Sequence, residues 1–277
     1  MIDRKEIFGY CEYSRILRRS EGFIYLLPHP RLRAWISNYT LSFPGESGIS
    51  EAYAIIPHGS ATMVVSWNPG GMTVDLFGPA TKVCSVGQRA NQAKCLLIVE
   101  FQPAGLFALT GIRQKELADQ CFPLEWIDTG LSRRLMQLIE AARTLNDLIA
   151  ALDHLLLHSR STVCAVPVAS MMHNILQERG NISVRELSLR TFYSERHLNR
   201  IFEEQAGMNL KSFSRLVRIN HAIRLLQDGR NSITYVADTA GYYDLPHFIR
   251  DFRSVCGFTP REYRCRMSDF YSEIAKF

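Results

Sequence analysis

Residues 194–202 read Ser-Glu-Arg-His-Leu-Asn-Arg-Ile-Phe, and residues 244–252 read Asp-Leu-Pro-His-Phe-Ile-Arg-Asp-Phe. In both stretches the apolar residues fall on one side of a helix, at helical spacing. Ser194 and Asp244 suit the N-cap position, and Pro246 falls in the first turn, where its missing N–H breaks no intrahelical bond. The sequence therefore predicts two equivalent helices offset by 50 residues.

A shorter helix is predicted before each of these two. Residues 184–188 form a short amphipathic pattern, and residues 189–193 break it. Ile233, Val236 and Ala237 make the corresponding helix of the second unit, followed by a turn at Gly241 and Tyr242. Between the two units, residues 210–227 form one continuous helical pattern, about 27 Å long at 1.5 Å per residue. The result is two helix-turn-helix units on one stiff connector.

Polar side chains suited to DNA lie on the exposed face of the first predicted helix. Arg196, Asn199 and Arg200 stand opposite its apolar face. Arginine can bind O6 and N7 of guanine, and asparagine can bind N6 and N7 of adenine. Two such units on a 27 Å connector could contact half-sites that lie one DNA turn apart, at about 34 Å.

These segments resemble the AraC/XylS family of transcription regulators. The resemblance covers residues 182–264 and rests on the two helix-turn-helix stretches and on residues 257–264, which read Gly-Phe-Thr-Pro-Arg-Glu-Tyr-Arg. It implies binding to double-stranded promoter or operator DNA and contact with RNA polymerase. The DNA-contacting residues that it implies are Ser194, Arg196, Asn199, Arg200, Leu245, Pro246, His247 and Arg250, with Asn209 and Thr259 as further candidates for backbone contacts.

Two departures from the family pattern make the units unequal. Ser188 stands where the family usually has alanine, and the second reading stretch is poor in hydrogen-bond donors. Leu245 and Pro246 can offer only apolar contacts, for instance to a thymine methyl group. We therefore expect the first unit to contribute more to sequence specificity.

The N-terminal half has a different pattern. Short β-branched and aromatic runs alternate with turn residues, which predicts antiparallel strands at 23–27, 35–43, 52–56, 61–67, 72–77 and 94–101. Leucines at helical spacing then predict helices around 131–139 and 145–156. The expected fold is α+β, with an antiparallel β-barrel closed by two helices over residues 1–160, a linker near 159–162, and an all-α domain of two helix-turn-helix units over 165–277.

Composition and charge agree with this division. Hydrophobic residues make up 47% and charged residues 21% of the 277 residues, as in globular proteins. The net charge is +5, and residues 161–277 hold 16 Lys and Arg, 14 of them Arg, against 12 Asp and Glu. The seven cysteines are irregularly spaced, which favours reduced packing residues, and the chain lacks both a signal-peptide pattern and a long apolar run. A cytoplasmic protein without a membrane anchor is expected.

The family commonly joins its DNA-binding half to a cupin-like β-barrel that binds an effector or makes a homodimer. The N-terminal half here is similar in character, and Trp67, Arg89 and Glu100 are its candidate effector-binding residues. A pocket of this kind needs a few polar groups among apolar walls.

Enzyme sites find little support in the sequence. Metal-dependent cupins use His-x-His with further ligands, whereas His58 stands alone, and His154 and His158 lack the glutamate of the zinc-protease pattern. We expect no catalytic residue, metal or cofactor. Three readings remain: an effector-responsive regulator, a regulator whose first domain only dimerises or binds a protein, and a metal-dependent cupin enzyme fused to a DNA-binding domain.

Overall fold

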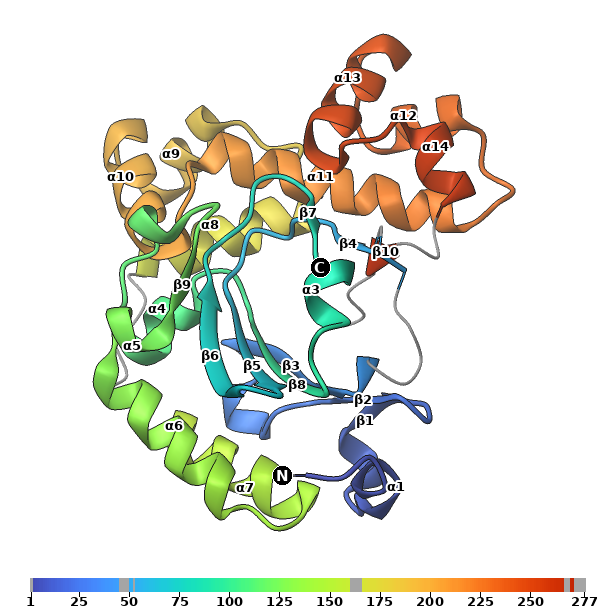
Figure 1. Cartoon of the computed structure of the whole chain (residues 1–277). Helices are drawn as coiled ribbons and strands as arrows, with labels where there is room; N and C mark the ends of the chain where they lie inside the picture. Colours follow the sequence, from blue (N-terminus) through green and yellow to red (C-terminus); the bar gives the residue numbers. More distant parts are fainter. Residues whose placement is uncertain (1, 45–49, 52, 160–165, 267–269, 272–277) are drawn as a thin grey trace.

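Strands with alternating burial form a curved antiparallel sheet in the first half of the computed structural model (Figure 1). The structure describes residues 2–44, 50–51, 53–159, 166–266 and 270–271. The large sheet has the strand order β1-β2-β3-β8-β5-β6-β9, and a small sheet has the order β10-β4-β7. Their bounds are β1 (Ile16–Arg19), β2 (Phe23–Leu26), β3 (Ile36–Ser42), β4 (Ala54–Ile55), β5 (Thr62–Asn68), β6 (Gly71–Phe77), β7 (Cys84–Ser85), β8 (Cys95–Phe101), β9 (Cys121–Pro123) and β10 (Phe270–Tyr271).

Helices line one side of the sheet and make up the second half of the chain. The first half contains α1 (Glu6–Gly9), α3 (Gly87–Ala90), α4 (Gly105–Thr110), α5 (Leu124–Ile127), α6 (Thr129–Ala141) and α7 (Leu145–Leu157), with 3-10 turns at Tyr13–Arg15, Pro30–Leu32 and Lys115–Leu117. The second half contains α8 (Val166–Gln177), α9 (Val184–Thr191), α10 (Glu195–Ala206), α11 (Leu210–Gln227), α12 (Ile233–Thr239), α13 (Leu245–Cys256) and α14 (Pro260–Cys265).

One hydrophobic core lies between the sheet and helices α6 and α7. Met63, Val65 and Trp67 alternate along β5 and pack into it, because successive side chains of a strand point to opposite faces. A buried ion pair joins the sheet side to α7, with Nη2 of Arg15 2.8 Å from Oδ2 of Asp153. Helix α7 is thereby fixed by packing and by charge.

A second core holds the helical half together and continues into the first half. Its largest fully buried side chains include Phe202, Phe213, Phe248 and Phe252. Ala54, Ile56 and Ala104 of the first half belong to the same cluster. Strand β10, near the end of the chain, pairs in parallel with β4 of the first half. The two halves therefore share a core instead of meeting through a thin contact.

The predicted fold class is confirmed, and several details differ. Helix α11 has the predicted bounds, and the six predicted strands and two closing helices are present. The first short helix runs to Thr191, so the expected break at 189–193 shrinks to the residues after it. The short strands β1, β7 and β9 were not predicted, and among the described residues no pairing joins β1 to β9, so the expected barrel is an open curved sheet. Of the predicted linker at 159–162, residues 160–162 lie outside the described residues.

Candidate nucleic-acid interface

Two reading helices, α10 and α13, have the same length and the same ends. Each is 12 residues long, and their first residues are 50 positions apart. Ser194 Oγ accepts a hydrogen bond of 3.3 Å from the backbone N–H of His197, and Asp244 Oδ1 accepts one of 2.6 Å from that of His247. Both helices end at a glycine in the left-handed region, at φ 80° and 78°. The repeat is therefore structural, as the two N-caps predict.

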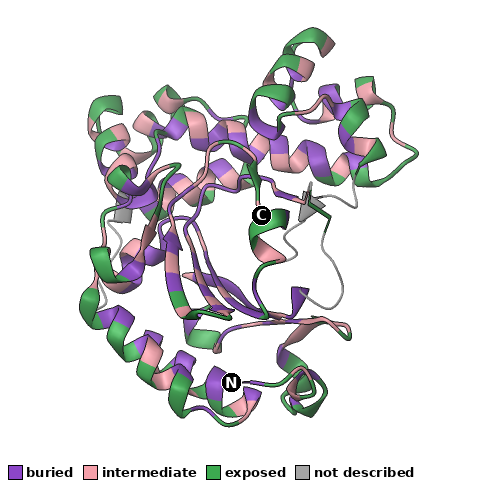
Figure 2. Cartoon of the chain, viewed as in Figure 1, coloured by how far each residue is buried: buried purple, intermediate pink, exposed green. Residues whose placement is uncertain are grey.

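The outer faces of the reading helices are exposed, and their inner faces pack on α11 (Figure 2). Arg196, Arg200 and Arg250 all lie on exposed positions. Arg200 Nη1 lies 3.2 Å from Glu204 Oε1, with the two side chains 58% and 37% exposed. An exposed pair of this kind contributes little to stability, so Arg200 can exchange Glu204 for a DNA contact at small cost.

Asn199 is half-buried and hydrogen-bonded within the protein. Its Oδ1 accepts a hydrogen bond of 3.1 Å from the backbone N–H of Leu210, the first residue of α11. Its Nδ2 donates to the Glu195 carbonyl at 3.1 Å. Each atom that would bind adenine thus has one partner within the protein, and the side chain ties α10 to α11. The role of Asn199 in reading DNA stays a prediction.

The second reading helix presents a mixed surface. Pro246 and His247 are exposed, and Leu245 packs partly against the helical core. The His247 ring meets the buried Tyr242 ring edge-on, with centroids 5.3 Å apart. This agrees with the expectation that the second unit offers few hydrogen-bond donors. The departure at Ser188 is explained locally, because its Oγ donates to the Tyr193 carbonyl at 2.6 Å in the turn.

A polar cluster that the sequence did not reveal fixes the second unit to α11. Tyr242 Oη donates to Asp251 Oδ2 at 2.8 Å, and Asp251 also pairs with Arg215 of α11. Arg218 of α11 stacks over the Tyr242 ring at 5.3 Å. Burial, reinforced by Asp251, raises the pKa of Tyr242 well above its ordinary value, so its hydroxyl remains a donor.

Two exposed aromatic residues at the turns also escaped the sequence prediction. Phe192 is 94% exposed and has a left-handed backbone at φ 61°, and Tyr243 is 96% exposed. Each lies within two residues of the N-cap of a reading helix. The spacing of apolar residues along the sequence gives no signal for such positions, because they belong to neither a strand nor a helix pattern.

The three candidate effector residues do not come together. Trp67 packs in the core beneath α6 and α7, and Thr62 of the same strand pairs in register with Glu100. Positions 62 and 67 lie on opposite faces of the strand, so Trp67 and Glu100 do too. Arg89 pairs with Asp75 at 2.8 Å. Burial and the Glu100 charge raise the pKa of Tyr53 to about 12.

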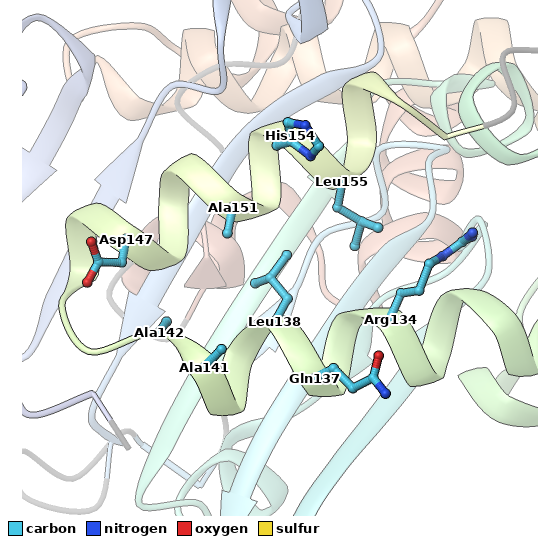
Figure 3. Close-up of a pocket in the computed structure, with 9 residues that line it drawn as sticks. All are labelled: Arg134, Gln137, Leu138, Ala141, Ala142, Asp147, Ala151, His154 and Leu155. Carbon is cyan, nitrogen blue, oxygen red and sulfur yellow. The ribbon is translucent and has the colours of Figure 1, made fainter.

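A groove lies between α6 and α7, on the side of the sheet toward which Trp67 packs. The groove has a volume of about 510 Å³, with Leu138 and Leu155 in its floor and Arg134 and Asp147 toward opposite ends (Figure 3). His154 and His158 stack at a centroid distance of 4.2 Å. Within the described ranges, no group of three or more His, Cys, Asp or Glu side chains is placed to hold a metal ion. No described helix is long and apolar enough to cross a membrane.

Comparison with known proteins bears on both halves. Residues 187–266 match the model of a helix-turn-helix domain, and residues 25–123 match a domain of unknown function (DUF6597). The transcriptional activator RhaR of Yersinia pseudotuberculosis is 36% identical over 72 residues, which is 26% of this chain. The matched segment covers 25% of the length of RhaR.

Solved structures resemble the chain in part. A probable AraC family transcriptional regulator from Rhodopseudomonas palustris is 30% identical, with a TM-score of 0.34 over 37% of this chain and 97% of its own. ToxT from Vibrio cholerae is 10% identical, with a TM-score of 0.43 over 77% of this chain and 93% of its own.

Proposed function

We propose that this protein is a sequence-specific DNA-binding transcription regulator of the AraC family, because residues 187–266 match the model of a helix-turn-helix domain. The observation that supports this most directly is the pair of reading helices, identical in length and capping, with exposed arginines on their outer faces. DNA then lies against the N-terminal ends of both helices. RNA polymerase is the expected protein partner at a promoter, and the cytoplasm, where the DNA is, is the expected location.

We propose that the two helices read DNA unequally. Arg196 and Arg200 of α10 contact base edges, and Arg250 with His247 does so from α13, while Leu245 and Pro246 supply apolar contacts. Ser194 keeps its hydroxyl proton after accepting the cap hydrogen bond, so it can donate to a phosphate. The first helix therefore brings two guanine-binding arginines and the second brings one.

The test begins with selection of bound DNA from a random pool, followed by Arg200→Ala and Arg250→Ala. Each substitution is expected to weaken binding by about 1–3 kcal/mol and to relax the preference at one position. Arg230→Ala is the matched control, because Arg230 is exposed and pairs with Asp228 in a loop away from both helices. If Arg200→Ala and Arg250→Ala behave like the control, the named readers are wrong.

Salt dependence gives an independent check. Phosphates that are neutralised by arginine release counterions, so affinity must fall steeply as salt concentration rises. A flat response between low and physiological salt contradicts binding to DNA.

The first half is proposed to control the second, through a small-molecule effector or through a homodimer. The sheet face that carries Glu100 and Asp75, with Arg89 of α3 paired to Asp75, is the proposed effector side, and a ligand that binds it should raise the thermal midpoint of the full chain. The groove between α6 and α7 is the proposed homodimer surface. Arg134 and Asp147 lie toward its opposite ends, so in a two-fold arrangement Arg134 of one copy can pair with Asp147 of the other. Sedimentation of the wild type and of Leu138→Asp distinguishes the two roles.

A catalytic role is the remaining alternative, and we propose that the protein is not an enzyme. A metal-dependent enzyme in the first half predicts a bound transition metal. Elemental analysis of the purified protein tests this, and a stoichiometric metal contradicts the proposal.

A further inference from the structure

Two loops of the first half meet the C-terminal ends of both reading helices. They are residues 78–83, after β6, and residues 113–120, after α4, and together we call them the brace. The backbone N–H of Gln114 donates to the Glu204 carbonyl of α10 at 2.9 Å, and that of Val83 donates to the Val255 carbonyl of α13 at 2.9 Å. Carbonyls in the last turn of a helix lack intrahelical partners. The first half thus caps both reading helices.

The packing at these two points is close. A Cβ on Gly207, at the end of α10, would lie 2.8 Å from Cγ of Pro79. A Cβ on Gly257, at the end of α13, would lie 3.1 Å from a Cγ of Val83. Both glycines therefore have two roles. They end their helices at positive φ, and the absence of a Cβ leaves space for the brace to pack against the helix ends.

The brace is itself held together. Gly78 N–H donates to the Gln120 carbonyl at 2.9 Å, and Asp119 N–H donates to the Pro79 carbonyl at 3.1 Å. Thr81 donates to the Asp119 carboxylate twice, from its N–H at 2.7 Å and from its hydroxyl at 2.6 Å. These bonds make the two loops one unit, which contacts the ends of both α10 and α13.

The four elements close a frame around the reading helices. Helix α11 holds α10 through the Phe202 and Phe213 rings, 5.3 Å apart, and holds α13 through Arg215 and Asp251. The brace adds a second contact at the end of each reading helix, and in Figure 1 the loop after β6 rises from the sheet to the helical layer. The N-caps Ser194 and Asp244 are exposed at the far ends of their helices, about 18 Å from the braced ends. The brace therefore leaves the DNA-facing ends open.

We infer that the brace, with Gln114 and Val83 as its positioning residues, sets the separation and angle of the two reading helices and so determines which spacing of half-sites the protein binds. This rests on the proposed function. A reading helix that is held by α11 alone can tilt. A reading helix that is held by both α11 and the brace keeps its N-terminus in one position. Each base pair between half-sites shifts the second by about 3.4 Å and turns it by about 35°, so a fixed pair of readers must discriminate spacing.

The experiment measures affinity of the full chain for the selected site and for sites with one or two base pairs added between the half-sites. Wild type is expected to lose about tenfold or more for two added base pairs. Insertion of two glycines after Lys82 slackens the brace, and the loss is then expected to be less than about threefold, because a flexible connection tolerates several geometries. Two glycines after Gly70, in an open hairpin, are the matched control.

A second variant tests the brace if the insertion disturbs folding. Lys115 Nζ lies 3.3 Å from Glu203 Oε2. Lys115→Glu creates repulsion at this point and is expected to broaden the spacing profile, and Lys115→Glu with Glu203→Lys is expected to restore it. A wild-type profile in both the slackened and the Lys115→Glu proteins overturns the inference and assigns spacing to α11 alone. No binding by wild type to any selected DNA overturns the proposed function as well.

Discussion

The Asn199 side chain can serve either DNA reading or the contact between α10 and α11, and its replacement separates the two roles. As a base reader it would donate to N7 and accept from N6 of adenine. In the structure its amide instead links the Glu195 carbonyl to the Leu210 N–H. Replacement by alanine therefore tests whether this side chain serves the DNA or the fold.

The structural role predicts a loss of stability. Asn199→Ala removes two hydrogen bonds of about 0.5–1.5 kcal/mol each and leaves the N–H of the buried Leu210 without its partner. We expect a loss of about 1–3 kcal/mol, and the thermal midpoint falls by about 2–4 °C for each kcal/mol in a chain of this size. Arg196→Ala, an exposed position on the same helix, should change stability by less than about 0.5 kcal/mol.

Asn199→Asp separates the two roles. Aspartate keeps the oxygen that accepts from Leu210 N–H and places a negative charge at the N-terminus of α11, where the helix dipole favours it. It cannot donate to adenine. Circular dichroism melting and binding to the selected DNA are measured on all three variants. If Asn199→Ala melts like wild type and loses about 1–3 kcal/mol of affinity at one A·T position, the structural assignment is refuted.

Three further predictions concern stability. Ser194→Ala should cost about 1 kcal/mol through loss of the N-cap of α10, which denaturant unfolding measures against wild type. Hydrogen bonds from Thr259 lower the pKa of Glu262, so the stabilisation is present above the ordinary value of 4.5 and is lost as pH falls through the lowered pKa. Glu262→Gln should therefore lower the melting temperature near about pH 7, and the difference from wild type should shrink as pH falls below 4.5; a difference that does not change with pH would contradict this. Asp153→Ala should cost about 3–5 kcal/mol because it leaves buried Arg15 with only the exposed Glu12 as an ionic partner, and a loss under about 1 kcal/mol in urea would show that the pair is not buried in solution.

Local signals explain what the sequence predicted correctly. The caps Ser194, Asp244 and Asn209 accept from N–H groups three residues later, and apolar residues at helical spacing follow each one. All of this information lies within one or two turns of chain. The bounds of α11 and the equivalence of α10 and α13 could therefore be predicted, as could the leucine-rich helices α6 and α7.

What the sequence could not supply depends on contacts between distant residues. Asn199 reads as an exposed polar residue because its partner, Leu210, lies beyond the end of its own helix. Trp67 and Glu100 both looked available for a pocket, since their opposite directions follow only from the register of β5 and β8. The strands β1, β7 and β9 are two to four residues long and owe their form to neighbours, not to a pattern of their own.

The contacts of the brace also limit how much its release can change DNA binding. Two backbone hydrogen bonds contribute about 0.5–1.5 kcal/mol each. The ion pair between Lys115 and Glu203 adds about 0–1 kcal/mol. Its contribution lies toward the lower end of this range, because the Lys115 side chain is 63% exposed. An effector that releases the brace can therefore change the free energy of DNA binding by about 1–4 kcal/mol. This corresponds to a change in affinity of between about fivefold and a thousandfold. That range contains the coupling energies of about 1–3 kcal/mol that are typical between distant sites, so no larger rearrangement of the chain is required for the first half to regulate the second.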